Sequence, residues 1–100
     1  MLVVLQTRAF SRWLARLADG QIQMRLIGRI QQAETGNLGD WKHIDATISE
    51  LRLHFGSGYR IYFTRRERNM VLLLVGGDKS SQQRDIQKAR RIAAKLIELP

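Results

Sequence analysis

The sequence contains no cysteine, a single proline and no long apolar run, and these absences narrow the class of protein. Without cysteine the chain forms neither disulfides nor thiolate metal sites, so we expect it in the cytoplasm rather than in an oxidising compartment. The apolar residues 1–5 are too few for a signal peptide or a membrane span. Export and a membrane partner are therefore not expected.

Acidic residues are also scarce, since 9 Asp and Glu stand against 17 Lys and Arg and leave a net charge of +8. A domain this basic is better explained by a polyanionic or acidic partner than by solubility alone. The cations gather in the second half of the chain, at Arg60, Arg65, Arg66, Arg68, Lys79, Arg84, Lys88, Arg90, Arg91 and Lys95. We therefore expect contact with a nucleic acid or an acidic protein.

Length and apolar spacing predict a single α+β domain over residues 1–100, which buries roughly 60–70% of its unfolded surface. A short strand at 3–5 precedes two helices, the first capped by Thr7 and the second following a break at Asp19. We expect the two helices to form a hairpin on a sheet. Their apolar faces are Phe10, Trp13, Leu14 and Leu17, and then Ile22, Leu26, Ile30 and Ala33.

The second half of the chain predicts three or four strands and a final helix. Residues 41–44 and 48–55 have strand character, and residues 70–75 are apolar without alternation, as expected for a central strand. Ser80 and Gln83 resemble a capping box, which predicts a helix that begins near Ser81. Its buried face is expected to be Ile86, Ala89, Ala93, Leu96 and Ile97.

A three-residue hairpin loop at 56–58 sets the register of the strands on either side of it. That register places His54 opposite Arg60 and Arg52 opposite Tyr62, and all four side chains share one face. The apolar residues of the same strands face the other way, at Leu51, Leu53, Ile61 and Phe63.

This polar face carries groups that metal-independent RNA cleavage requires, namely proton carriers and cations for the phosphorane-like transition state. We expect His54 as general base, because an arginine opposite favours the neutral imidazole, or Tyr62 as proton carrier. Arg60 is expected to clamp phosphate, and Lys79 to add a cation at a glycine turn before a helix. Further RNA contacts are predicted at Arg52, Lys42 and Arg84. No histidine or carboxylate cluster has ligand spacing, so we expect no metal and no cofactor.

Each candidate also has a purely structural interpretation, which stays open. His54 is equally well explained as a surface side chain, and Tyr62 as an ordinary strand residue. Arg60 is explained without RNA if it forms an ion pair with Glu50 or Asp78.

Five segments carry a recognisable pattern: Phe10 to Leu17, Gly36-Asn37-Leu38-Gly39-Asp40, Glu50-Leu51-Arg52, Gly58-Tyr59-Arg60-Ile61-Tyr62-Phe63 and Gly76-Gly77-Asp78-Lys79-Ser80-Ser81-Gln82. By these segments the chain resembles the HigB-like branch of the RelE/ParE toxin superfamily, the addiction-module killer proteins. The resemblance implies a RelE-like fold, with a mixed, mostly antiparallel sheet, an N-terminal helical hairpin and a C-terminal helix. It also implies the toxin of a type II toxin–antitoxin system, paired with a helix-turn-helix antitoxin of the HigA type.

RelE-like toxins cut mRNA in the ribosomal decoding site without metal, so the resemblance implies mRNA and the ribosome as partners. Arg60 matches the strand arginine of the family directly, Arg52 and His54 match its basic pair approximately, and Lys79 matches its basic residue after the last strand. The chain departs from the pattern at Ile86, near where RelE has a helix tyrosine.

Three functions remain open at this point. The leading one is a ribosome-dependent mRNA endoribonuclease that inhibits translation and arrests growth. A ParE-like inhibitor of DNA gyrase would act by binding a protein and needs no nuclease chemistry. A noncatalytic nucleic-acid-binding module would keep the fold without the reaction, and the missing helix tyrosine keeps this alternative open.

Overall fold

The computed structural model describes residues 1–98, which form one sheet and three α-helices. In chain order the elements are β1 (Val3–Gln6), α1 (Arg8–Ala15), α2 (Gly20–Glu34), β2 (Trp41–His43), β3 (Ser49–Arg52), β4 (Arg60–Glu67), β5 (Met70–Gly77), the 3-10 turn η1 (Lys79–Ser81) and α3 (Gln82–Glu98). The strand order is β1-β5-β4-β3-β2, in which β1 runs parallel to β5 and the other pairs are antiparallel. The predicted α+β class is confirmed, with its mixed, mostly antiparallel sheet and its C-terminal helix.

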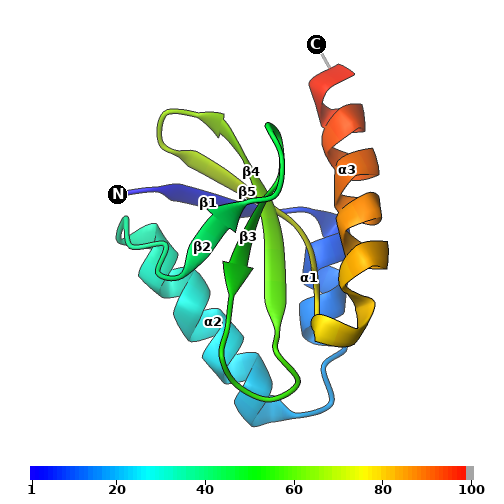
Figure 1. The fold of residues 1–100 in the computed structure, drawn as a ribbon. Helices are drawn as coiled ribbons and strands as arrows, with labels where there is room; N and C mark the ends of the chain where they lie inside the picture. Colours follow the sequence, from blue (N-terminus) through cyan, green and yellow to red (C-terminus); the bar gives the residue numbers. More distant parts are fainter. Residues whose placement is uncertain (99–100) are drawn as a thin grey trace.

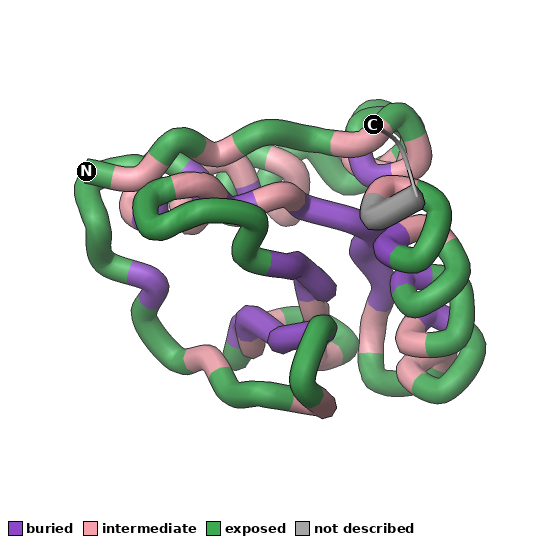
Figure 2. Tube along the Cα trace, turned by 90° about the horizontal axis from the view of Figure 1, so that it is seen from above, coloured by how far each residue is buried: buried purple, intermediate pink, exposed green. Residues whose placement is uncertain are grey.

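Helices cover both faces of the sheet, and each face has its own apolar core (Figure 1). Under α1 and α2 the core includes Phe10, Leu26, Ile30, Leu51, Leu53, Ile61, Phe63, Val71 and Leu73. Under α3 a smaller core contains Ile48, Tyr62, Leu74, Val75, Ala89 and Ala93. Figure 2 shows the buried positions gathered where helices meet strands, while the outer side of α3 is exposed. The side chain of Ile97, expected on the buried face of α3, lies outside the described side chains.

Side-chain caps determine where the helical segments begin. Thr7 Oγ1 accepts a hydrogen bond from the Phe10 N–H at 3.1 Å, as predicted for the first helix. The predicted cap at Ser80 is wrong, because the capping box forms two residues earlier. Asp78 Oδ1 accepts the Ser80 N–H at 2.9 Å, and Ser81 Oγ accepts the Asp78 N–H at 3.4 Å. The chain therefore enters η1 first and continues into α3 at residue 82.

The register of β3 against β4 differs from the prediction by two residues, because the connection is longer than a three-residue turn. β3 ends at Arg52, which lies opposite Arg60, and residues 53–59 connect the strands. Both glycines of this connection, at positions 56 and 58, have positive φ angles of 57° and 78°. A shift of two residues keeps each side chain on its predicted face. Arg52, Arg60 and Tyr62 thus still share a face, whereas His54 lies beyond the end of its strand.

Candidate active site

Three cations meet at the corner of the sheet where β3 ends, β4 begins and β5 ends. Arg52 and Arg60 are paired in the ladder, and Lys79 lies in η1, shortly after β5. A side-chain carbon at Gly58 would lie 3.4 Å from Lys79 Cβ and 3.7 Å from Arg60 Nη1, so both residues border the same small space. The structure thus brings together three predicted site residues, which we call the basic corner (Arg52, Arg60 and Lys79).

A buried carboxylate lies between the two arginines of the basic corner. Only 1% of the Glu50 side chain is exposed, and its Oε1 accepts the Arg52 Nε–H at 2.9 Å. Glu50 Oε2 lies 3.8 Å from Arg60 Nε and accepts a hydrogen bond from Gln82 Nε2 at 3.4 Å. The sequence predicts Glu50 only as an alternative ion-pair partner of Arg60. The signal that could have identified it is strand alternation, which places a carboxylate on the same face as Arg52 two residues away.

Arg60 is held in place while keeping free hydrogen-bond donors. Its Nη1 donates to the Gly58 carbonyl at 3.1 Å, and its buried Nε has no hydrogen-bond partner among the described residues. The side chain is 16% exposed, so part of it reaches the surface. Because a guanidinium carries five N–H donors, an arginine held by so few contacts is suited to bind an anion.

The connection before β4 is tied to η1 by Ser57. Its Oγ donates to Asp78 Oδ2 at 3.0 Å, and its carbonyl accepts the Lys79 N–H at 3.3 Å. Hydrogen bonds from the hydroxyls of Ser80 and Ser57 hold the pKa of Asp78 below its usual value. These contacts fix the backbone position of Lys79, while its side chain stays exposed.

Tyr62 lies in the core beneath α3 and not on an accessible face. The residue is 0% exposed, and its hydroxyl has no hydrogen-bond partner among the described residues. Burial raises the pKa of the Tyr62 phenol, and the carboxylates of Glu50 and Asp85 raise it further. Strand alternation predicted its face correctly, but the expected role as a proton carrier conflicts with this position, because α3 covers the face at that point.

His54 faces Asp40 instead of Arg60. Its Nε2 lies 2.5 Å from Asp40 Oδ2, and 74% of the His54 side chain is exposed. This hydrogen bond is the main reason why the pKa of Asp40 is lowered. The predicted pairing with Arg60 is wrong, because β3 ends before His54. The backbone of this segment lies next to the basic corner, since the Asp40 carbonyl accepts the Arg52 N–H at 2.9 Å, whereas the His54 side chain lines a hollow with Arg25, Gly28 and Arg29 of α2.

The two remaining predicted RNA contacts lie on different surfaces. Lys42 is exposed on β2 and pairs with Glu50 in the ladder, so it extends the face that carries the basic corner. Arg84 is exposed on α3 and lines a separate hollow of about 510 Å³ together with Trp13 and Gly76. We therefore group Lys42 with the basic corner and treat Arg84 apart from it.

Two features are absent from residues 1–98, the part of the chain that the structure describes. No group of three or more histidine or acidic residues there has a geometry that could hold a metal ion. No helix there is long and apolar enough to cross a membrane.

Comparison with solved structures identifies the fold as RelE-like. The chain is similar to a mutant of the E. coli toxin RelE in its free state, with a TM-score of 0.58 and 14% sequence identity. The match covers 91% of this chain and 97% of that one. At this identity the likeness concerns the fold alone.

Comparison of sequences then defines the family. The family model described as "Phage derived protein Gp49-like (DUF891)" matches residues 12–97, and the chain belongs to this family. An uncharacterized protein of Haemophilus influenzae is 39% identical over 90 residues, which cover 90% of this chain and 91% of that protein. Membership of the HigB-like branch stays a prediction.

Proposed function

We propose that the chain is the toxin of a type II toxin–antitoxin system of the HigB type and cuts mRNA on the ribosome without a metal ion. Its partner would be a helix-turn-helix antitoxin of the HigA type, and both would act in the cytoplasm. The observation that carries this proposal is the basic corner, where two paired arginines share one buried carboxylate and Lys79 lies beside them. The RelE-like fold supports it, since the solved relative is itself described as a toxin.

The proposed reaction is attack of a 2′-hydroxyl on the adjacent phosphate, which forms a 2′,3′-cyclic phosphate. The bond to the 5′-oxygen breaks, and that oxygen takes up a proton from water. Negative charge grows on the phosphoryl oxygens as this bond forms, and fixed cations lower the barrier by stabilising that charge. Arg60 is suited to this role because its contacts with Gly58 and Glu50 fix the guanidinium and leave other donors free. Lys79 supplies a second positive charge, while Arg52 and Lys42 hold the RNA strand along the same face.

We assign proton acceptance to His54, on the basis of its contact with Asp40. A carboxylate that accepts the Nε2–H of an imidazole orients the ring and leaves Nδ1 as the nitrogen that can accept a proton. The His54 side chain is 74% exposed and so is accessible to a 2′-hydroxyl of bound RNA. Tyr62 takes no part in this scheme.

The test is to map mRNA 5′ ends after induction of the wild-type chain and of Arg60→Ala, both in cells and in a translation extract with and without ribosomes. We expect new 5′ ends with the wild type only when ribosomes are present, and their loss in the Arg60→Ala variant. Arg91→Ala, which removes an exposed cation of α3, is the matched control and should cut normally.

Other outcomes would point elsewhere. Growth arrest with intact mRNA and broken DNA would indicate that the chain inhibits DNA gyrase and is not a nuclease. Binding of RNA without new ends and without arrest would indicate a noncatalytic module. In either case the basic corner would need another explanation.

A further inference from the structure

Strand β4 is longer than its neighbour β3 and therefore has an open edge. The ladder between them begins with Ser49 opposite Phe63, so residues 64–67 are paired with β5 alone. Before Ser49 the chain turns back, because the Asp45 carboxylate accepts the N–H groups of Thr47 and Ile48, each at 2.8 Å. Within the described part of the chain, no backbone group outside β5 bonds to residues 64–67. Backbone donors and acceptors on the outer side of this segment are thus free to pair.

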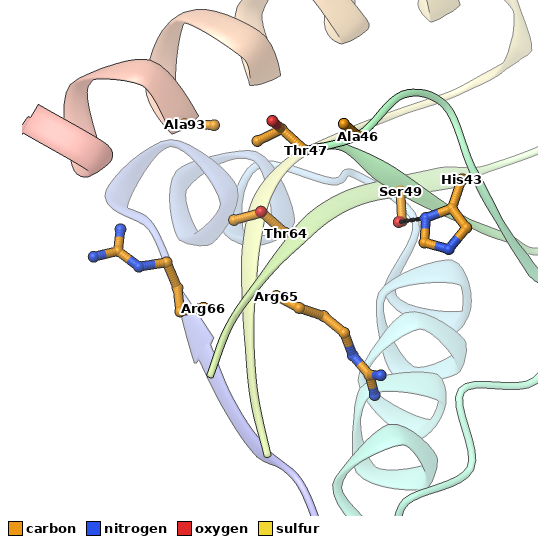
Figure 3. A pocket seen from close by; sticks show the side chains of 8 residues that line it. All are labelled: His43, Ala46, Thr47, Ser49, Thr64, Arg65, Arg66 and Ala93. Atoms are coloured by element: carbon orange, nitrogen blue, oxygen red, sulfur yellow. Dashed lines mark hydrogen bonds between the residues drawn. The ribbon is translucent and has the colours of Figure 1, made fainter. Parts of the chain in front are cut away.

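A hollow of about 400 Å³ lies next to this edge (Figure 3). Most of its lining residues are small, namely Ala46, Thr47, Ser49, Thr64 and, from α3, Ala93. A hydrogen bond of 3.2 Å between Ser49 Oγ and His43 Nδ1 is drawn at one end of the hollow. These side chains leave room for another chain beside β4, where the next strand of a sheet would lie about 4.8 Å away.

The charged side chains along the open edge of β4 indicate what kind of peptide it would bind. Arg65 and Arg66 are exposed, line the hollow and form no ion pair among the described residues. Glu67 is the acidic residue on the segment itself, and Asp45 nearby is already paired with Arg90 at 2.9 Å. Charged side chains commonly protect a strand edge from self-association. Here the excess is positive, so the edge repels a second copy of this basic chain and attracts an acidic strand.

The outer edge of β1 has no comparable positive charge. Val3 and Leu5 are each 46% exposed there, and the strand itself carries no charged residue. An acidic peptide has no electrostatic reason to choose β1 over β4.

We propose that residues 64–67 of β4 and the adjacent hollow bind an extended, acidic segment of a protein partner, which adds a strand to the sheet. Main-chain hydrogen bonds to β4 provide the pairing, and Arg65 and Arg66 select the acidic sequence. Strand addition favours a peptide over a nucleic acid, because it uses backbone N–H and C=O groups of both partners. This peptide site lies near the start of β3, whereas the basic corner lies at the end of β3. Because the two sites are separate, peptide binding at β4 does not depend on whether the chain cleaves RNA.

The test uses a synthetic peptide in which two adjacent glutamates are flanked by valines, because adjacent side chains of a strand point to opposite faces, as those of Arg65 and Arg66 do. Amide hydrogen exchange and backbone NMR shifts are the measurements. We expect slower exchange and shifted resonances at residues 64–67. Two analogues, methylated at alternate amide nitrogens in opposite phases, should differ in affinity by about tenfold, because only one phase removes the ladder hydrogen bonds. This comparison uses the unmodified protein and does not depend on any variant that folds poorly.

Charge is tested by the double variant Arg65→Glu with Arg66→Glu, which should weaken binding at least about tenfold. The matched control is Lys88→Glu with Arg91→Glu, which changes the net charge equally on the exposed side of α3 and should bind normally. Equal binding of both methylated peptides, or protection at β1 or at the basic corner, would overturn the proposal. Protection of residues 64–67 by a single-stranded RNA, or by dimer formation at high concentration, would overturn the choice of occupant.

Discussion

Arg52 and Arg60 lie directly opposite each other in the β3–β4 ladder, although two like charges in this position repel. Glu50 offsets the repulsion, because one of its oxygens accepts the Arg52 Nε–H at 2.9 Å and the other lies 3.8 Å from Arg60 Nε. One buried carboxylate thus faces two guanidinium groups, and a net positive charge remains. An anionic ligand at the basic corner would complete the charge balance.

Replacing Glu50 by glutamine should destabilise the protein and weaken cleavage. Removal of one partner from a fully buried ion pair costs about 3–5 kcal/mol, and partial exposure of the two arginines reduces this to roughly 1–3 kcal/mol. Urea unfolding measures the loss of stability, and mapping of mRNA 5′ ends measures cleavage. Glu34→Gln, at an exposed position of α2, is the control that removes a carboxylate without either effect. Full cleavage by folded Glu50→Gln protein would show that Glu50 does not position Arg60.

Replacing Tyr62 by phenylalanine should leave cleavage intact and stability unchanged or higher by about 1 kcal/mol. The reason is that the buried hydroxyl has no hydrogen-bond partner among the described residues, so the wild type bears its desolvation penalty. Tyr62→Ala is the contrasting variant and should lose about 3–5 kcal/mol through the cavity it leaves. Thermal unfolding and growth arrest are the measurements. Loss of growth arrest in stable Tyr62→Phe protein would restore the tyrosine as a proton carrier.

Local signals in the sequence predicted the elements well, because they depend on neighbouring residues alone. The Thr7 cap and the apolar spacing of Phe10 and Leu14 identified the first helix. The apolar run from Met70 predicted β5, which lies between β1 and β4. The end of β3 was predicted too late, because the connection to β4 is built around two glycines and uses residues 53–59.

The candidate site was predicted only in part, because its geometry depends on packing between distant segments. Arg60 and Lys79 were chosen from their chemical type and position, and the structure places both at the basic corner. The burial of Tyr62 could not be predicted in this way, because it results from the packing of α3 against β4. The role of Glu50 likewise depends on α3, whose Gln82 closes one side of the carboxylate. Periodicity gives the face of each residue but not what covers that face.

Replacing Lys79 by glutamine should make RNA binding less dependent on salt. Each phosphate neutralised on single-stranded RNA contributes about 0.7 to the slope of log affinity against log salt concentration, so the slope should fall by about that amount. Stability should not change, because Lys79 is exposed. Fluorescence anisotropy with a labelled RNA oligonucleotide at several salt concentrations is the measurement. Lys95→Gln, further along α3, should keep the full slope; an equal fall in both variants would mean that Lys79 acts only through net charge.

Replacing Asp45 by asparagine should lower stability near neutral pH and leave it almost unchanged in strong acid. Hydrogen bonds from the N–H groups of Ile48 and Thr47 lower the pKa of Asp45 below its ordinary value of 3.8, and Arg90 adds a smaller effect. A carboxyl with a lowered pKa stabilises the fold above the unfolded pKa, and this stabilisation disappears as the pH falls through 3.8 and then through the folded value.

The difference in melting temperature between wild type and Asp45→Asn should therefore be roughly 1–4 °C at pH 7 and should shrink as the pH falls below 3.8 and through the lowered pKa of the folded state. Thermal unfolding at a series of pH values measures it. Arg90→Gln keeps both backbone hydrogen bonds to the carboxylate, so most of the acid dependence should survive in that variant. A difference between wild type and Asp45→Asn that is equally large at pH 2.5 and pH 7 would mean that the ionised carboxylate does not hold the turn. The open edge of β4 would then need another explanation, since this turn is what leads the chain away from it.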